Sequence, residues 1–502
     1  MRRRGWKFWV VRGVAFAASG LAGLADAGAQ QAADPPADAQ EGPRYRFIER
    51  YADPREDHRL AGTLDQYRVA FRQTIAIAQD RPRGTPIRQE ITHEATYLER
   101  PARVSATKPG KVVSTVRRYE SARSKPDPRP LQAGPWPLEG LTVWVHLPEG
   151  GAHQILSLTP RRRLRDVEFR NVYDQIAVTE LPSLLPPRPI RKGDTWAVSQ
   201  EGAELLLGAI PDGGELKGTL VEVRDDPKGG GGKITAVMEI AGRLAGANSE
   251  VGLRARVHFA YDPPPPGGGK AGGDTIDAVG AIVKLSMGQS EDAGLTARDD
   301  RLRSKTVRQL VLERRFGAGA EVPLLEIPDP PPKATPENSW ITFADPNERF
   351  SFRHPQELRL VTGGLGASPD SLFLIRTSPE LGDLSVKLFF MAKVQLKPDD
   401  AFRQIFKAVR EERRLGLQQG EYRTLNWKGK RVLHKEATLK PPGPADAEGA
   451  RAVTLDAYLI QFAQDASLIV EATTSQDPPA DDRKEVEEML KTFRVGRPPK
   501  DE

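Results

Sequence analysis

The sequence predicts a multidomain protein: an all-β N-terminal body, built on a large antiparallel curled sheet or half-barrel, and a smaller α+β body after it. Segments rich in Val, Ile, Thr, Tyr and Phe recur through residues 45–317, and many alternate apolar with polar residues as half-buried strands do. A proline-rich stretch follows at residues 318–340. Two helical patterns then occur within residues 341–496, where apolar residues recur every three or four positions.

The first 29 residues have the pattern of a secretory signal peptide. An apolar run over residues 10–25 leads to Ala27-Gly28-Ala29, a small-residue cleavage site. Basic residues precede the run: Arg2, Arg3, Arg4 and Lys7. The alternative is a membrane anchor, but Arg12 interrupts the run and leaves a stretch too short to span a bilayer. We therefore expect cleavage near Ala29 and a periplasmic or secreted protein, by either the Sec or the twin-arginine route.

Composition and charge exclude several classes of function. The absence of cysteine among 502 residues excludes disulfides, thiolate nucleophiles, cysteine-ligated zinc and a lipidated cysteine. Loss of residues 1–29, with five basic residues and one acidic, would lower the net charge from +6 to +2. The basic cluster at residues 161–165 is followed by Asp166 and Glu168, which favours a solvated turn. We expect no nucleic-acid partner, and no membrane span in the mature chain because no other segment reaches 18 apolar residues.

The β-rich body follows a flexible leader at residues 30–44, which offers almost nothing to bury. Turn residues such as Asp225-Asp226-Pro227-Lys228-Gly229 and the run at residues 263–269 separate its strands. The segments with the strongest strand pattern are residues 66–78, 88–98, 111–119, 141–147, 218–223, 233–240, 253–261, 275–286 and 305–316. The body is therefore expected to consist almost entirely of strands.

The stretch at residues 318–340 predicts a semi-rigid spacer, because its prolines prevent strand pairing. After it, Asp399 and Asp400 stand where a helix N-terminus favours acids. One helical face should then carry Phe402, Ile405, Phe406 and Val409, and a second should carry Val486, Met489, Leu490 and Phe493. Between these helices we expect two hairpins, formed by residues 422–427, 431–439, 454–462 and 468–473. Residues 497–502 form a tail.

The C-terminal body resembles the PsbP/DcrB-like α/β/α sandwich. The resemblance covers about 155 residues and rests on Phe350-x-Phe352-x-x-Pro355, the helix at residues 399–415, the passage YLIQFAQDASLIVEATTS and the terminal Lys491-Thr492-Phe493-Arg494-Val495. Members of that fold mostly act as binding or assembly modules and share no catalytic set. The resemblance therefore implies a binding role and assigns no catalytic residue.

The N-terminal body resembles secreted bacterial β-rich proteins of unknown function, through the passage LPPRPIRKGDTW at residues 185–196. Gly193-Asp194 predicts a tight turn, and Trp196 is interpreted as a core anchor with a ligand contact as the alternative. The overall pattern is also similar to half-barrel lipoprotein-carrier folds of the cell envelope, although no motif carries that resemblance.

No motif for catalysis or metal binding stands out, and we predict no catalytic, cofactor-binding or metal-ligating residue. No two histidines are spaced to place two ligands on one face; they are His58, His93, His146, His153, His258, His354 and His434. The glycine run at residues 229–232 fails as a phosphate loop, because Ile234 replaces the Ser or Thr that follows the lysine. Ser105-Ala106-Thr107-Lys108 fits S-x-x-K but lacks its companion motifs.

These observations favour an exported, non-enzymatic cell-envelope protein that binds a protein or an apolar ligand. The alternative is a hydrolase of envelope or extracellular polymer, with carboxylates supplied by separate strands of the β-rich body. Two facing carboxylates in a cleft would favour the enzyme, whereas an apolar groove or an aromatic patch would favour binding. The partner, the oligomeric state and the domain that carries the function stay open.

Overall fold

The computed structural model describes most of the chain between residues 43 and 496. The described residues are 43–49, 66–80, 86–105, 112–125, 138–147, 153–176, 178–208, 213–226, 233–245, 249–263, 275–297, 300–316, 322–345, 347–361, 371–378, 382–413, 416–427, 430–440, 453–462, 465–474 and 480–496. The chain divides into two compact units. The β unit contains Val167–Lys333 and the described residues before Arg161, and the sandwich unit contains Arg161–Asp166 and the described residues from Ala334 onward. The signal peptide, the leader and the tail lie outside the described residues.

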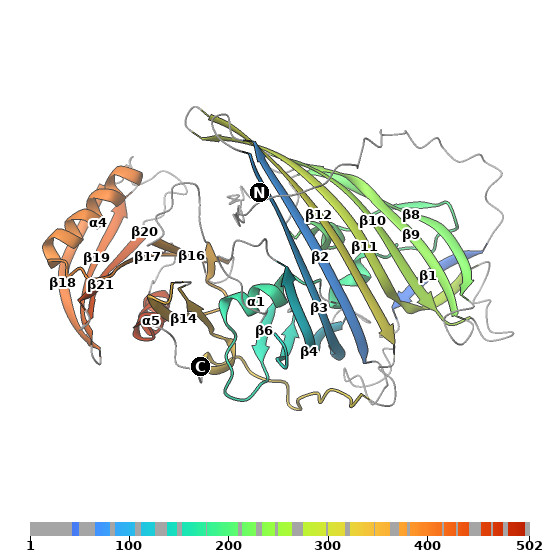
Figure 1. The fold of residues 1–502 in the computed structure, drawn as a ribbon, viewed down its shortest axis with the longest axis horizontal. Coiled ribbons are helices and arrows are strands. Elements are labelled where there is room, and N and C mark those ends of the chain that lie inside the picture. The colour runs from blue at the N-terminus through green and yellow to red at the C-terminus, as the bar shows by residue number, and fades with distance from the viewer. Residues whose placement is uncertain are drawn as a thin grey trace. The chain divides into compact units, whose positions relative to one another are not determined.

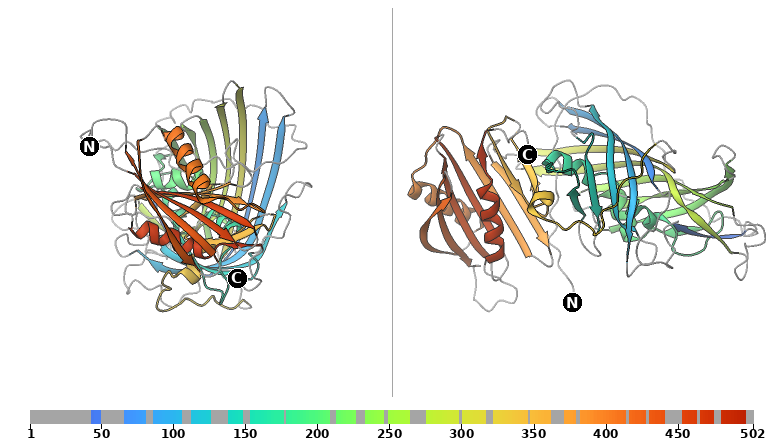
Figure 2. Two further views of the ribbon diagram at one scale, coloured as in Figure 1. Left: turned by 90° about the vertical axis from the view of Figure 1, so that its left-hand side faces the viewer. Right: turned by 90° about the horizontal axis from the view of Figure 1, so that it is seen from below.

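The β unit is built on one open sheet of 12 strands in the order β6-β5-β4-β3-β2-β12-β11-β10-β9-β8-β7, with β1 added parallel to β11. All other neighbours are antiparallel, and the long strands lie side by side in Figure 1. The strands are β1 (Arg44–Glu49), β2 (Tyr67–Asp80), β3 (Ile87–Val104), β4 (Val112–Lys125), β5 (Thr142–His146), β6 (Gln154–Ser157), β7 (Thr195–Ala197), β8 (Gly213–Asp226), β9 (Lys233–Ala245), β10 (Ser249–Tyr261), β11 (Thr275–Ala297) and β12 (Asp300–Phe316). Figure 2 shows this large sheet from two further directions.

Alternating burial confirms the strand predictions. In β2, the buried residues Tyr67, Val69 and Phe71 alternate with exposed Arg68 and Arg72. The hairpin of β11 and β12 extends beyond the predicted segments, because their backbones remain paired from Lys284–Glu313 to Ala297–Asp300 through largely polar sequence. A ladder of backbone hydrogen bonds does not require apolar side chains. The apolar pattern therefore predicted strands that are shorter than the paired ones.

The expectation that the first body consists almost entirely of strands is wrong at one segment. Residues 166–208 form α1 (Asp166–Tyr173), the 3-10 helix η2 (Val178–Leu184) and α2 (Gln200–Leu207), besides β7. These helices have only seven or eight residues each, which is too short for a clear 3.6-residue period. Local capping helps to define α2: the Ser199 hydroxyl oxygen accepts a hydrogen bond from the backbone N–H of Gly202, and Gly208 ends the helix at φ 75°.

The first part of the predicted spacer packs on the β unit. Leu325 is buried with Leu98 and Trp144, and its backbone N–H donates to Gln66 Oε1 at 2.6 Å. Arg100 Nη1 donates to the carbonyl oxygen of Leu325 at 2.7 Å. The residues around Leu325 therefore cover part of one face of the large sheet.

The sandwich unit contains a second sheet of seven strands in the order β15-β16-β17-β21-β20-β19-β18, and a small sheet β13-β14-β22. The strands are β13 (Ile341–Ala344), β14 (Phe350–His354), β15 (Arg359–Val361), β16 (Ser371–Ser378), β17 (Gly382–Met391), β18 (Gly416–Trp427), β19 (Lys430–Lys440), β20 (Val453–Phe462), β21 (Ala466–Thr474) and β22 (Arg494–Val495). The helices are α3 (Pro336–Ser339), α4 (Pro398–Arg413) and α5 (Ala480–Lys491).

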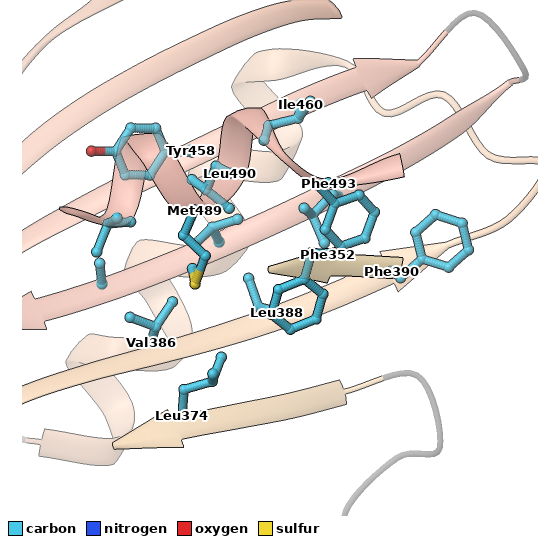
Figure 3. Packing of buried hydrophobic residues seen from close by; sticks show 14 of the residues in the cluster. Phe352, Leu374, Val386, Leu388, Phe390, Tyr458, Ile460, Met489, Leu490 and Phe493 are labelled. Atoms are coloured by element: carbon cyan, nitrogen blue, oxygen red, sulfur yellow. The ribbon is translucent and has the colours of Figure 1, made fainter. Parts of the chain in front are cut away.

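Two helices cover opposite faces of this second sheet. Leu459 of β20 packs in one cluster with Phe402 of α4, whereas the next residue, Ile460, packs in another with Leu490 of α5. Successive residues of a strand point to opposite faces, so the layers run helix, sheet, helix. Figure 3 shows the cluster under α5, where Met489 and Leu490 lie among side chains of the sheet.

The predicted helical faces are buried as expected, apart from Val409, whose side chain lies outside the described residues. Among the described helices, none has the length and apolar character needed to cross a membrane.

Candidate functional site

A cluster of buried polar side chains lies on the face of the large sheet that residues 166–208, the cover segment, pack against. Two neighbouring pairs of β3 and β4 build it: Glu99 stands opposite Arg117, and Tyr97 opposite Tyr119. Opposite residues of an antiparallel pair project to the same face, and so do positions two apart along one strand. These four residues and Gln175 are called the buried polar cluster below.

Gln175 comes from the cover segment, in the connection between α1 and η2. Its Oε1 accepts a hydrogen bond of 2.8 Å from the Tyr119 hydroxyl, which ties the cover segment to β4. Further along the segment, Trp196 packs so closely over Gly218 of β8 that a Cβ there would come within 2.2 Å of the indole. The cluster therefore lies at the junction between the sheet and its cover segment.

An ion pair forms the centre of the cluster. Arg117 Nε lies 3.0 Å from Glu99 Oε1, and both side chains are 0% exposed. Thr115 donates its hydroxyl to the same carboxylate oxygen at 3.1 Å. The guanidinium carbon of Arg117 also lies 4.7 Å from the centre of the Tyr97 ring. Glu99 thus holds one edge of a guanidinium that rests on an aromatic face.

The Tyr119 hydroxyl interacts with the Arg117 guanidinium. Several polar atoms of the cluster nevertheless make no hydrogen bond of standard geometry with the described residues. They are Arg117 Nη1 and Nη2, Gln175 Nε2, Glu99 Oε2 and the Tyr97 hydroxyl. Most buried polar groups are hydrogen-bonded, and one left without a partner costs about 1–3 kcal/mol. Both guanidinium nitrogens and the amide nitrogen are donors only, so the set presents more donors than acceptors.

At neutral pH, Arg117 and the two tyrosines of the cluster all keep the protons that they can donate in hydrogen bonds. Burial lowers the pKa of Arg117, but Glu99 and the two tyrosines outweigh that effect and leave the pKa well above its ordinary value, so the side chain is charged. Burial raises the pKa of Tyr97, which Arg117 only partly offsets. Burial likewise raises the pKa of Tyr119 to about 12. Both phenols therefore keep their protons at neutral pH.

A second buried arginine lies on the same face. Arg314 of β12 is 3% exposed, donates from Nη1 to the carbonyl oxygen of Ile282 at 2.9 Å and lies over the Tyr67 ring at 4.1 Å. Tyr67 stands opposite Glu99 across β2 and β3, and the Arg314 charge also acts on Tyr97. Two arginine side chains are therefore buried on this face of the sheet.

The sandwich unit holds a separate buried pair. His434 Nε2 and Asp456 Oδ1 are 2.7 Å apart, and Arg483 Nε of α5 donates to the same carboxylate oxygen at 3.0 Å. Tyr458 stacks on the imidazole, with ring centres 4.6 Å apart. A His–Asp pair can orient a general base, but here the carboxylate is shared with Arg483 and connects α5 to β19 and β20. This network is best explained as structural.

The structure scatters the other residues that the sequence singled out. His93, His146, His258 and His354 lie on separate strands. His58, the glycine run and residues 106–108 lie outside the described residues. In the described part of the chain, no three His, Asp or Glu side chains come together as a metal site would require. Trp196 is buried at 5% exposure, in agreement with a core anchor.

Sequence reasoning missed the buried polar cluster. A signal was present, because Tyr97 and Glu99 share one face of a strand whose other face carries Leu98, and Thr115, Arg117 and Tyr119 repeat that arrangement in the next strand. The alternation of apolar and polar residues predicts a half-buried strand but does not show that the polar face is covered. A Glu on one strand and an Arg on the next, each flanked by tyrosines, could instead have indicated a buried pair.

Comparison with known proteins gives similarity to solved structures only. No family model matches the chain, and no curated protein matches it. Cyanobacterial PsbP (CyanoP) from Synechocystis sp. PCC 6803 is 14% identical, with 31% of this chain and 92% of that chain covered and a TM-score of 0.25. The Ran-binding protein Mog1p of Saccharomyces cerevisiae is 10% identical, with coverages of 32% and 96% and a TM-score of 0.25.

A LolA superfamily protein from Nitrosomonas europaea is 10% identical, with 52% of this chain and 88% of that chain covered and a TM-score of 0.12. The first two matches each cover about a third of this chain. The resemblance predicted for the N-terminal body is not confirmed.

Proposed function

We propose that the chain is an exported, non-enzymatic binding protein of the cell envelope, and that its β unit takes up an apolar ligand between the large sheet and the cover segment. The observation that carries this proposal is the buried polar cluster. Tyr97, Arg117 and Gln175 present buried polar atoms without a partner among the described residues, at the junction of the two layers. A small molecule held there would both satisfy these atoms and bury apolar surface.

Buried apolar side chains adjoin the cluster. Val69 stands opposite Tyr97, Val143 stands opposite Arg117, and both valines are fully buried. From the cover segment, Leu181 and Leu206 are also fully buried. The ligand would therefore gain most of its binding free energy from burial of apolar area.

A hydrolase has weaker support from this geometry. Glu99, the carboxylate of the cluster, accepts hydrogen bonds from Arg117 and Thr115. Both donors occupy Oε1 of this carboxylate, and no second carboxylate is paired with it in the cluster as a glycosidase site would require. Turnover of an envelope polymer that one carboxylate substitution abolishes would favour the enzyme instead.

The test is titration of the purified full chain with an uncharged naphthylamine fluorophore, which becomes bright in apolar surroundings. We expect saturable binding that Leu206→Ala weakens, since this residue lies in α2 of the cover segment. Leu459→Ala in the sandwich unit is a matched control, because both leucines are 0% exposed, and it should leave the affinity unchanged. Circular dichroism should show that both variants are folded under the assay conditions. Absence of saturable binding, or equal weakening by both variants, would refute the proposal.

A further inference from the structure

Building on the proposed function, we infer that the ligand is an amphiphilic anion, and that Arg117 binds its carboxylate or phosphate head group. The Tyr97 hydroxyl and Gln175 Nε2 act as additional donors. The apolar part of the ligand then lies along the buried valines beside the cluster and the buried leucines of the cover segment.

The geometry of the guanidinium supports this inference. An arginine can bind oxyanions along the edge that contains Nε or along the edge formed by Nη1 and Nη2. Glu99 occupies Nε at 3.0 Å. Nη1 and Nη2 are buried and make no hydrogen bond of standard geometry among the described residues. Besides Glu99, the Tyr119 hydroxyl is a polar group that interacts with the guanidinium. The second edge is therefore available to two oxygens of one head group, in the bidentate arrangement that carboxylate and phosphate adopt.

The excess of hydrogen-bond donors over acceptors favours an anionic head group over a neutral one. Arg117 and Gln175 contribute donors only, and the Tyr97 hydroxyl keeps its proton. An uncharged alkyl chain would leave these donors unsatisfied, whereas an oxyanion accepts hydrogen bonds from them.

Glu99 acts as a positioning residue for the head group. It fixes the guanidinium from one side, and Thr115 fixes the carboxylate in turn. The Tyr97 ring supports the guanidinium 4.7 Å from its centre. The Nη1–Nη2 edge of Arg117 is thus oriented before the ligand binds, which reduces the entropy lost on binding.

The experiment measures displacement of the same uncharged fluorophore from the full chain by decanoate, decyl phosphate and decanol, which share one chain length. At neutral pH we expect one or both anions to bind at least about tenfold more tightly than the alcohol, as loss of a charge-assisted hydrogen bond implies. Comparison of the two anions distinguishes a carboxylate from a phosphate ligand.

Two conservative variants locate the head group. Gln175→Glu keeps an acceptor for the Tyr119 hydroxyl but adds a negative charge to the buried polar cluster, and it should abolish the preference for the anions. Tyr97→Phe should reduce the preference severalfold. Tyr458→Phe is the matched control, since the Tyr458 hydroxyl is also buried without a partner but belongs to the sandwich unit, and it should leave the preference intact.

The outcomes separate this inference from the proposed function. If decanol binds as tightly as the anions, the head-group inference is wrong while the proposed function stands. If neither the fluorophore nor any of the three compounds binds, both are wrong. A preference for anions that survives Gln175→Glu and Tyr97→Phe would place the head group elsewhere and also refute the inference.

Discussion

The Glu99–Arg117 pair shows how strongly one residue of the buried polar cluster can affect the stability of the fold. Both side chains are fully buried, and Arg117 neutralises the carboxylate directly. Removing one member of a buried pair leaves an uncompensated charge, which costs about 3–5 kcal/mol. Replacing both members avoids that penalty.

We therefore predict that Arg117→Met destabilises the chain by about 3–5 kcal/mol, and that adding Glu99→Gln recovers a substantial part of the loss. The measurement is a double-mutant cycle from urea unfolding followed by tryptophan fluorescence. If Arg117→Met costs less than about 1 kcal/mol, the pair is not buried and charged as the structure indicates.

His93 makes the stability of the β unit depend on pH. Burial lowers the pKa of His93 from 6.5 to about 4. Between these values the unfolded chain binds a proton at this residue and the folded chain does not, so stability falls as the pH drops from 6.5 to 4. The full loss is about 3 kcal/mol.

We predict that His93→Gln flattens this part of the curve of unfolding free energy against pH. The variant and the parent chain should show the same dependence above pH 7, where the histidine is neutral in both states. The check is urea unfolding at intervals between pH 4 and pH 7. An unchanged slope in the variant would mean that His93 titrates normally in the folded chain.

Among the elements, α4 and α5 were predictable because each is long enough to show a repeating apolar face. The helices of the cover segment were not, because each has only seven or eight residues and packs mainly through a few side chains such as Phe169 and Leu206. Short helices gain their stability from tertiary packing rather than from local sequence. Sequence patterns therefore found α4 and α5 of the sandwich unit and missed the four-residue α3 and the helices of the cover segment.

Phe493, just beyond α5, joins that helix to the core of the sandwich unit. Its ring lies 5.2 Å from that of Phe350, 5.7 Å from that of Phe352 and 5.5 Å from that of Phe462, and the side chain is 0% exposed. We predict that Phe493→Asp destabilises this unit by several kcal/mol, because the carboxylate would be buried without a partner.

Tyr422→Asp provides the control, since Tyr422 is an aromatic residue of the same unit with 51% exposure. It should lower the stability much less than Phe493→Asp. Thermal unfolding of the intact chain followed by circular dichroism distinguishes the two. Equal melting of Phe493→Asp and the parent chain would show that this aromatic cluster does not stabilise the unit.

For the whole molecule, the two compact units agree in part with the multidomain prediction, whereas the exported state remains a prediction from the N-terminal sequence. A protein purified from its native host should begin near Gln30, because Ala27-x-Ala29 is the small-residue site that follows the apolar run. N-terminal sequencing tests this directly. Recovery of the chain with Met1 intact from the cytoplasm would rule out export.

The sequence by itself determined the character of the elements. Alternating apolar residues predicted the long strands, three-to-four spacing predicted α4 and α5, and the position of the prolines predicted a change of architecture near residue 330. These features are local, since each depends on residues within a few positions of one another. The absence of a metal or nucleophile motif likewise followed from residue types and spacing alone.

Only the tertiary structure decided that Glu99 meets Arg117. The two residues are 18 positions apart, and their pairing depends on an irregularity in the ladder, where Thr96 stands opposite Ser121 but Tyr97 stands opposite Tyr119. A register shifted by one residue would send the polar side chains to the other face of the sheet. The cover segment then encloses them. The cluster is set by register and packing between distant segments, which no local pattern in the chain specifies.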